Sequence, residues 1–160
     1  MQDPRSILIT GASSGIGWAL ALAYAKPGVT LFLGGRDGDR LSKLAVDCAA
    51  LGASVHERGV DVTDRPAMAA WIADSDAIAP LDLVIANAGI TTGTNRADAL
   101  EPEAQVRRLF AVNVDGVLNT VLPALPLMQS RERGQIALMS SMAGFRGLAG
   151  ASTYCATKAA

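Results

Sequence analysis

Cysteine, histidine and aromatic residues are scarce in this sequence of 160 residues. It contains 2 cysteines and 1 histidine, and aromatic residues make up 4%. The spacing of Cys48 and Cys155 fits no zinc or redox motif, so we expect free thiols in a reducing compartment. His56 has no second histidine to join it as a ligand and lies in a predicted strand. We therefore expect no metal site.

An excess of charge of one sign is also missing. The 14 lysine and arginine residues nearly balance the 15 aspartate and glutamate residues, for a formal net charge of -1. Such a chain has no strong field to attract nucleic acid or an anionic membrane. No uninterrupted apolar run reaches the ~18–20 residues that cross a bilayer, and residues 1–5 do not begin a signal peptide. We expect a cytoplasmic protein that binds neither nucleic acid nor membranes.

Apolar runs of strand length alternate along the chain with longer segments of helical period. Strands are predicted at 6–10, 29–33, 53–60, 81–86 and 135–140, and helices at 16–26, 37–51, 64–78, 101–128 and from 153 onward. Thr63 or Asp64 is expected to cap the third helix, with Pro66 in its first turn, and Pro123 is expected to bend the fourth. Strict alternation requires right-handed crossovers. The sequence therefore predicts one domain over residues 1–160, a doubly wound α/β fold with helices on both faces of a parallel sheet.

A glycine-rich turn separates the first predicted strand from the first predicted helix. Residues 10–17 read TGASSGIG. Glycines in a tight turn let the backbone approach a pyrophosphate, and the following helix N-terminus offers unpaired N–H groups to the phosphates. Many glycine-rich segments only make turns, but this one follows a strand and opens a helix, as a dinucleotide-binding fold requires. It predicts a dinucleotide cofactor.

A tyrosine and a lysine near the end of the sequence are spaced to share one face of a helix. Tyr154 and Lys158 are four residues apart in a Y-x-x-x-K segment. A nearby lysine ammonium favours the tyrosine phenolate, which gives a general acid or base usable at neutral pH. The spacing alone often occurs by chance in an amphipathic helix. Ser141 follows the fifth predicted strand, and Asn113 interrupts the apolar stripe of the long helix, which packing alone does not explain.

Taken together, these segments resemble the short-chain dehydrogenase/reductase family. The family's T-G-x-x-x-G-x-G, N-A-G, S-S-x-A-G and Y-x-x-x-K motifs match residues 10–17, 87–89, 140–144 and 154–158 in order. The resemblance implies a Rossmann-type fold and hydride transfer between a nicotinamide cofactor and a small carbonyl or alcohol. The implied cofactor contacts are Gly11, Ser13, Ser14, Gly15, Ile16, Gly17, Arg36, Asp61, Val62, Asn87, Ala88, Gly89, Tyr154 and Lys158. Among them, Asp61 and Val62 would flank the adenine ring.

The resemblance also implies a catalytic role for four residues. Ser141 would orient the substrate oxygen, and Tyr154 would give or take its proton. Lys158 would favour the Tyr154 phenolate and hold the ribose hydroxyls of the nicotinamide half. Asn113 would fix a kink in the backbone and a water that links Lys158 to solvent.

The end of the second predicted strand bears on which nicotinamide cofactor binds. Relatives that use NAD usually carry aspartate where this chain has Gly35, because a carboxylate accepts hydrogen bonds from the ribose 2′-OH and repels a 2′-phosphate. Arg36 follows, and a guanidinium can hold a phosphate through two N–H groups. We expect NADP(H) in preference to NAD(H). Arg36 could also be an ordinary loop cation, and the carboxylate of Asp37 could compete with a phosphate.

The sequence leaves the extent and assembly of the protein open. Relatives continue past the position of Ala160 with the last strands of the usual seven and a substrate-binding loop. A true fragment would expose an apolar sheet edge, so we expect a complete enzyme of which this is the N-terminal part. A non-catalytic NADP-binding fragment or interaction module is the alternative, and the phosphate-loop spacing disfavours a related epimerase or dehydratase. The long helix and the helix from 153 onward correspond to those that relatives use for subunit contacts, which predicts a homodimer or homotetramer.

Overall fold

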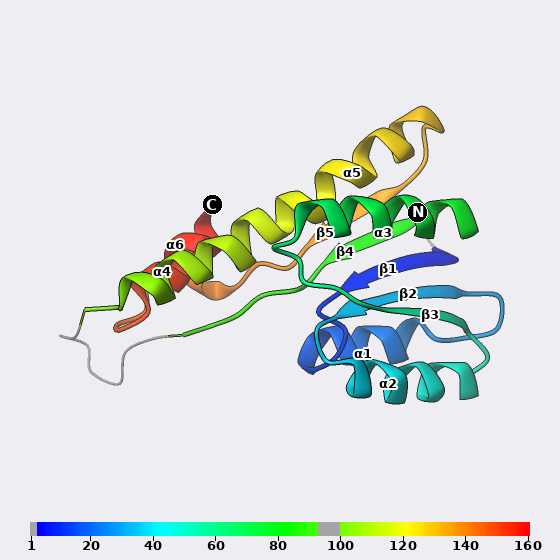
Figure 1. Cartoon of the computed structure of the whole chain (residues 1–160), viewed down its shortest axis with the longest axis horizontal. Coiled ribbons are helices and arrows are strands. Elements are labelled where there is room, and N and C mark those ends of the chain that lie inside the picture. The colour runs from blue at the N-terminus through cyan, green and yellow to red at the C-terminus, as the bar shows by residue number, and fades with distance from the viewer. Residues whose placement is uncertain (1–2, 93–99) are drawn as a thin grey trace.

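The centre of the computed structural model, which describes residues 3–92 and 100–160, is a parallel sheet. Its five strands follow the order β3-β2-β1-β4-β5 (Figure 1). The strands are β1 (Ser6–Thr10), β2 (Thr30–Gly35), β3 (Ser54–Gly59), β4 (Leu83–Ala86) and β5 (Gln135–Leu138). The helices are α1 (Gly15–Tyr24), α2 (Gly38–Ala50), α3 (Arg65–Ile78), α4 (Glu103–Phe110), the π-helical turn η1 (Ala111–Asp115), α5 (Gly116–Ser130), the 3₁₀ turn η2 (Met142–Gly144) and α6 (Ser152–Ala159). The predicted doubly wound α/β fold is confirmed.

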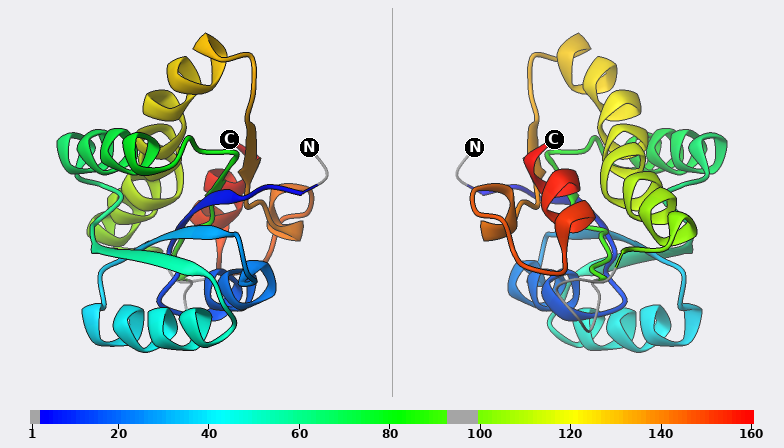
Figure 2. Two further views of the ribbon diagram at one scale, coloured as in Figure 1. Left: turned by 90° about the vertical axis from the view of Figure 1, so that its right-hand side faces the viewer. Right: turned by 90° about the vertical axis from the view of Figure 1, so that its left-hand side faces the viewer.

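Different helices cover the two faces of the sheet. Helices α1 and α2 lie on one face and α3 and α5 on the other, as the front and side views show (Figures 1 and 2). In β1, Ile7 and Ile9 join the apolar cluster beneath α1 and α2, whereas Leu8 joins the cluster with α3 and α5. Each fully buried side chain of this size contributes roughly 1.5–3 kcal/mol to stability. A strand covered on both faces must be apolar throughout, which is why β1 reads as a continuous apolar run.

Aspartate side chains cap the two helices that follow β2 and β3. Asp37 accepts a hydrogen bond from the backbone N–H of Arg40 at 3.1 Å at the start of α2. Asp64 does the same for Ala67 at 3.0 Å at the start of α3, with Pro66 in the first turn. Of the two expected caps of α3, Asp64 is therefore the one used.

The long helix predicted at 101–128 changes its hydrogen-bond pattern within η1. This turn joins α4 to α5 and contains Asn113. The helix then continues as α5 to Ser130, through both Pro123 and Pro126. The change of pattern falls at Asn113, where the family resemblance implied a kink, and precedes Pro123, where we expected a bend. Single π-helical turns inside longer helices are frequent at functional sites.

By length and composition alone, the continuous helix Glu103–Ser130 could cross a membrane. An 18-residue window within it has a mean hydropathy of 1.3, although the sequence contains no uninterrupted apolar run of that length. The core helix of a folded protein passes the same test. Here Ala124 and Met128 are buried in the cluster that α5 shares with α3, so at least one face of the helix packs within the protein.

The strand order reverses at β1, which pairs with β2 on one side and β4 on the other. The chain leaves β1 and β2 for helices on one face, and leaves β4 for the helix on the opposite face (Figure 1). Diverging connections open a crevice at the carboxyl ends of the strands, and this is where open α/β sheets bind ligands.

Candidate functional site

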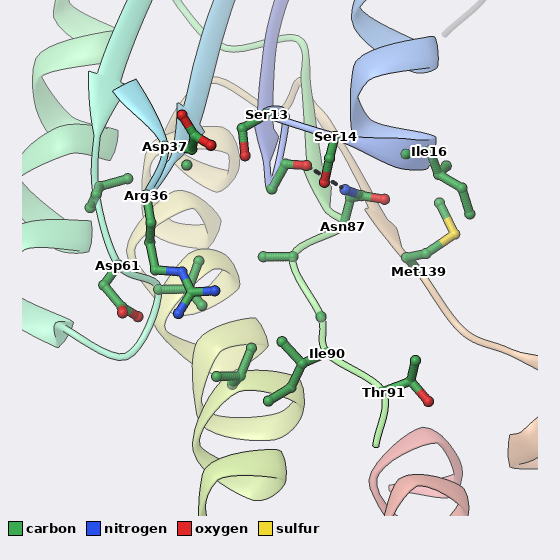
Figure 3. Close-up of a pocket in the computed structure, with 18 of the residues that line it drawn as sticks. Ser13, Ser14, Ile16, Arg36, Asp37, Asp61, Asn87, Ile90, Thr91 and Met139 are labelled. Atoms are coloured by element: carbon green, nitrogen blue, oxygen red, sulfur yellow. Dashed lines mark hydrogen bonds between the residues drawn. The ribbon is translucent and has the colours of Figure 1, made fainter. Parts of the chain in front are cut away.

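A cavity of about 480 Å³ opens at this crevice. Its walls come from the segments that follow each strand of the sheet and from α6 (Figure 3). The lining residues are Gly11, Ser13, Ser14, Gly15, Ile16, Gly35, Arg36, Asp37, Arg40, Val60, Asp61, Val62, Asn87, Ala88, Gly89, Ile90, Thr91, Val112, Met139, Tyr154 and Lys158. Residues from both ends of the sequence thus meet in one site.

The turn between β1 and α1 is bound tightly to the end of β4. The Asn87 side chain donates hydrogen bonds to the carbonyl oxygens of Thr10 at 2.9 Å and Gly11 at 3.3 Å, and it points at this turn in Figure 3. In return, Thr10 Oγ1 accepts from the backbone N–H groups of Asn87 and Ala88, both at 3.1 Å. A Cβ atom on Gly17 would collide with the Gly11 carbonyl and lie 2.6 Å from Asn87 Nδ2. Space alone therefore requires glycine at position 17.

The N-terminus of α1 faces the cavity. Ser14 is the N-cap residue, and within the described residues its side chain makes no capping hydrogen bond. Ser14, Gly15 and Ile16 all line the cavity. The first backbone N–H groups of a helix have no partner inside the helix. They can bind an anionic group that enters the cavity.

Gly35, Arg36 and Arg40 lie at the end of the cavity next to β2. In Figure 3 the Arg36 side chain extends toward Asp61, while the Asp37 carboxylate points away from it. Asp37 Oδ1 caps α2, and its Oδ2 lies 3.3 Å from Nε of Arg40. The Asp37 carboxylate is therefore engaged at the start of α2 and does not face Arg36.

Asp61 closes the same end of the cavity from the loop after β3. Its Oδ1 accepts hydrogen bonds from the backbone N–H of Thr63 at 2.9 Å and from the Thr63 hydroxyl at 2.8 Å. The backbone bond from Thr63 is the main reason that the pKa of Asp61 lies below its ordinary value. The Thr63 hydroxyl and the charges of Arg36 and Arg108 lower that pKa further, against the opposing effect of burial. A carboxylate is therefore present beside Arg36 at neutral pH.

Asn113 is buried in η1, and both the oxygen and the nitrogen of its side-chain amide form hydrogen bonds within the protein. Its Oδ1 accepts from the backbone N–H of Ile90 at 2.8 Å, and its Nδ2 donates to the Ile90 carbonyl at 2.9 Å. The same Nδ2 donates to Thr157 Oγ1 at 3.0 Å. Asn113 thus joins the loop after β4 to helix α6, from behind the cavity wall.

Tyr154 and Lys158 lie on α6 and both line the cavity. The Lys158 ammonium donates a hydrogen bond to the carbonyl oxygen of Met139, just after β5, at 2.8 Å. An ammonium group has three N–H donors, so with respect to residues 3–92 and 100–160 two remain for groups inside the cavity.

Ser141 and Gly144 belong to the segment that packs against α6. Ser141 Oγ accepts a hydrogen bond from the backbone N–H of Ala143 at 3.1 Å and so caps η2. This bond uses an oxygen lone pair and leaves the hydroxyl proton to donate. A Cβ atom on Gly144 would collide with the Lys158 carbonyl oxygen, so glycine allows the close approach of η2 to α6.

Comparison with known proteins assigns the chain to a family. The family model described as short chain dehydrogenase matches residues 5–160. The chain belongs to the short-chain dehydrogenase family. Its family membership agrees with the resemblance noted from the motifs.

Two relatives and one solved structure illustrate how far the likeness extends. An uncharacterized oxidoreductase of Myxococcus xanthus is 45% identical over 156 residues, which are 97% of this chain and 61% of that protein. An NADP-dependent 3-hydroxy acid dehydrogenase of Schizosaccharomyces pombe is 34% identical over 161 residues, 99% of this chain and 62% of that protein. The crystal structure of NAD+-bound xylitol dehydrogenase has a TM-score of 0.90 at 24% identity, covering 99% of this chain and 62% of that one, and supports the fold. The chain spans less than two thirds of the length of each.

Most site residues expected from the sequence of this short-chain dehydrogenase lie around one cavity, and three do not line it. Gly17 and Asn113 pack behind the wall, and Ser141 is a half-buried residue outside the lining that caps η2. Other lining residues were not among the expected contacts: Gly35, Asp37, Arg40, Val60, Ile90, Thr91, Val112 and Met139. Val60 and Met139 could have been predicted to line the cavity, because each directly follows a strand. Arg40 and Val112 belong to no motif, and only the folded chain brings them to the cavity.

Proposed function

We propose that this chain carries the cofactor site and catalytic centre of an NADP(H)-dependent oxidoreductase that interconverts a small carbonyl compound and its alcohol. The observation that carries the proposal is that Tyr154 and Lys158 line the same cavity as the glycine-rich turn. Short-chain dehydrogenases are oxidoreductases that use NAD or NADP. The bound nicotinamide would supply or accept the hydride.

The shape of the glycine-rich turn supports a dinucleotide in this cavity. The close packing of Gly17 on Gly11 brings backbone, with no side chain between, to the wall of the cavity. The uncapped N-terminus of α1 next to it offers N–H donors and a partial positive charge to a pyrophosphate.

Three residues at the other end of the cavity support NADP over NAD. Gly35 supplies no carboxylate to bind a ribose 2′-OH or to repel a 2′-phosphate, and Arg36 extends into the cavity. The Asp37 carboxylate, which could have repelled a phosphate, is bound to the start of α2 and to Arg40. Since the relatives include both an NADP-dependent enzyme and an NAD+-bound one, these residues of the chain itself decide the proposal.

In the proposed reduction, Tyr154 donates its hydroxyl proton to the substrate oxygen, and in the oxidation it takes the proton back. The positive charge of Lys158 stabilises the phenolate that remains. The hydrogen bond to Met139 fixes the ammonium at one point, and its two other N–H groups are available for ribose hydroxyls.

Ser141 and Asn113 have supporting parts in the proposed reaction. The free hydroxyl proton of Ser141 would donate to the substrate oxygen and orient it for Tyr154. Asn113 holds α6 against the loop after β4 through its bonds to Ile90 and Thr157. The proposal therefore assigns Asn113 to keeping Tyr154 and Lys158 in place, together with any water that it holds near Lys158.

Binding and turnover experiments test the proposal in two steps. The chain is titrated with NADPH and with NADH, and NADPH oxidation is then followed with a panel of ketones, sugars and steroids. Tyr154→Phe should abolish turnover and change the NADPH dissociation constant by less than about twofold, because it removes only the hydroxyl. Failure to bind either cofactor would contradict the cofactor site. A variant that keeps its rate within a few-fold would contradict the catalytic assignment and favour a binding module.

We also propose that the protein is a cytoplasmic homodimer or homotetramer. Phe110, Leu118 and Leu122 are exposed along α4 and α5, with Leu122 58% accessible. Exposed apolar side chains in a row favour association. Cys48 and Cys155 are both free thiols, which suits a reducing compartment. Sedimentation equilibrium of wild type and Leu122→Asp measures the association, and a monomeric wild type would contradict it.

A further inference from the structure

The helix that carries Tyr154 and Lys158 begins without a side-chain cap of its own. Its N-cap residue, Ala151, has no side-chain acceptor. The first-turn N–H groups need an acceptor from elsewhere.

Glu101 supplies that acceptor from a distant part of the sequence. Its Oε2 accepts a hydrogen bond from the backbone N–H of Thr153 at 3.3 Å, across 52 positions of the chain. Among the described residues, its other oxygen, Oε1, is buried and has no hydrogen-bond partner. A carboxylate at a helix N-terminus interacts favourably with the helix dipole. Among the described residues, the N-terminus of α6 is therefore the group that stabilises the half-buried carboxylate of Glu101.

Other anchors of α6 act further along the helix. Asn113 binds Thr157, the side chain of Lys158 binds Met139, and Cys155 Sγ accepts a hydrogen bond from the Leu148 N–H at 3.2 Å. Glu101 binds the N–H of the residue directly before Tyr154. Loss of the Glu101 contact would therefore loosen the first turn of α6, next to Tyr154, while the turn with Lys158 stays attached.

We propose that Glu101 is a positioning residue for the catalytic helix. Its carboxylate caps α6 from outside the helix and holds Tyr154 at the cavity. The catalytic consequence rests on the proposed function, whereas the capping itself does not. Glu101 belongs to none of the sequence motifs. It precedes α4 and does not line the cavity.

Three variants separate capping from the other properties of this side chain. Glu101→Ala removes the acceptor and the charge, and Glu101→Gln keeps an acceptor oxygen without the charge. Glu103→Ala is the matched control, because Glu103 is a nearby glutamate that is exposed and pairs only with Arg107 among the described residues. If the alanine variant does not fold, Glu101→Met keeps the volume and still removes the acceptor.

Backbone hydrogen exchange across residues 150–160 measures the cap directly. In Glu101→Ala the amides of the first turn of α6 should exchange about fivefold faster, the effect of losing one helix cap. Glu101→Gln should restore most of the protection, and Glu103→Ala should match wild type. Unchanged exchange in Glu101→Ala would overturn the capping role. If that variant does not fold, unchanged exchange in Glu101→Met would overturn it.

Kinetics then test the positioning of Tyr154. We expect kcat of Glu101→Ala to fall by about fivefold or more while the NADPH dissociation constant stays within about twofold, because the phosphate turn and Arg36 are untouched. Glu101→Gln should recover most of kcat. Faster exchange with wild-type kcat would overturn the positioning role. If wild type itself neither binds NADPH nor turns over, the proposed function fails, and hydrogen exchange still decides whether Glu101 caps α6.

Discussion

Asn113 Nδ2 donates a hydrogen bond to Thr157 Oγ1 at 3.0 Å, and this hydroxyl donates in turn to the carbonyl oxygen of Tyr154 at 2.8 Å. The two side chains lie 44 positions apart and are both buried. The π-helical turn therefore connects to the backbone of the helix that carries Tyr154 and Lys158. Removal of either side chain should affect stability and the site together.

Replacement of Asn113 by alanine should destabilise the protein. The variant removes the bonds to both half-buried backbone groups of Ile90, and because a buried unpaired group costs about 1–3 kcal/mol, we expect a total loss of roughly that size. Urea denaturation measures the loss in the free energy of unfolding. Asn119→Ala is the control, since among the described residues its amide makes one bond, to the Val62 carbonyl at 2.9 Å. Equal losses in the two variants would contradict the account of Asn113.

Gly17→Ala should destabilise the turn by roughly 1–3 kcal/mol, because the added methyl group collides with the Gly11 carbonyl and Asn87. NADPH affinity should fall with it. Gly38→Ala serves for comparison, because nothing lies within 4 Å of its added Cβ at the start of α2. That variant should be neutral or more stable by up to ~1 kcal/mol. Thermal denaturation distinguishes the two, and similar melting points would contradict the crowding at position 17.

Arg36→Gln should weaken NADPH binding by about ten- to a hundredfold and leave NADH binding nearly unchanged, since it removes the proposed charged hydrogen bond to the 2′-phosphate. The loss should shrink at high ionic strength, because the side chain is exposed to solvent. Arg58→Gln, on the exposed pair with Asp74, controls for the general loss of a positive charge. Fluorescence titration gives both dissociation constants. An equal loss for the two cofactors would contradict the 2′-phosphate assignment.

Stability should depend on pH through Asp61. Its pKa in the folded protein lies below the ordinary value of 3.8, so its ionised form stabilises the fold above that pH. The contribution is lost as the pH falls through the folded pKa. Asp61→Asn should therefore lose less stability than wild type on acidification from about pH 5 downward. Urea denaturation over this range measures it, and parallel curves would exclude the effect.

Two neighbouring aspartates should differ in their effect on stability. Asp76 makes two hydrogen bonds with Arg131, at 2.8 and 3.0 Å, in a half-buried pair, whereas Asp74 pairs with Arg58 on the surface. Asp76→Asn should cost roughly 1.5–3 kcal/mol and Asp74→Asn less than about 1 kcal/mol. Denaturation of both variants under the same conditions gives the comparison. A larger loss at Asp74 would reverse our ranking of the two pairs.

Contacts between residues close in sequence were predictable, and contacts over long separations were not. The apolar period placed every strand of the sheet to within a few residues, because burial on both faces demands apolar runs such as 6–10. The turn at 10–17 was evident from its glycines. The resemblance implied a kink at Asn113, where the chain has the π-helical turn η1. The bond from Glu101 to Thr153 was not predictable, since it depends on residues that only the fold brings together. Motif matching indicated Asn113 but not its partners.

The bonds that hold α6 in place also have a consequence for the order of folding. The strands at the Arg36 end of the cavity, β1, β2 and β3, form one continuous stretch of chain. The glycine-rich turn and the helix with Tyr154 instead depend on bonds across 77, 52, 44 and 19 positions. Because closing a longer loop costs more entropy, we expect the β1–β3 stretch to form first, and the turn and α6 to be fixed only when β4 and β5 have joined the sheet. A partly folded chain would thus have the Arg36 end of the cavity without the two segments that complete it.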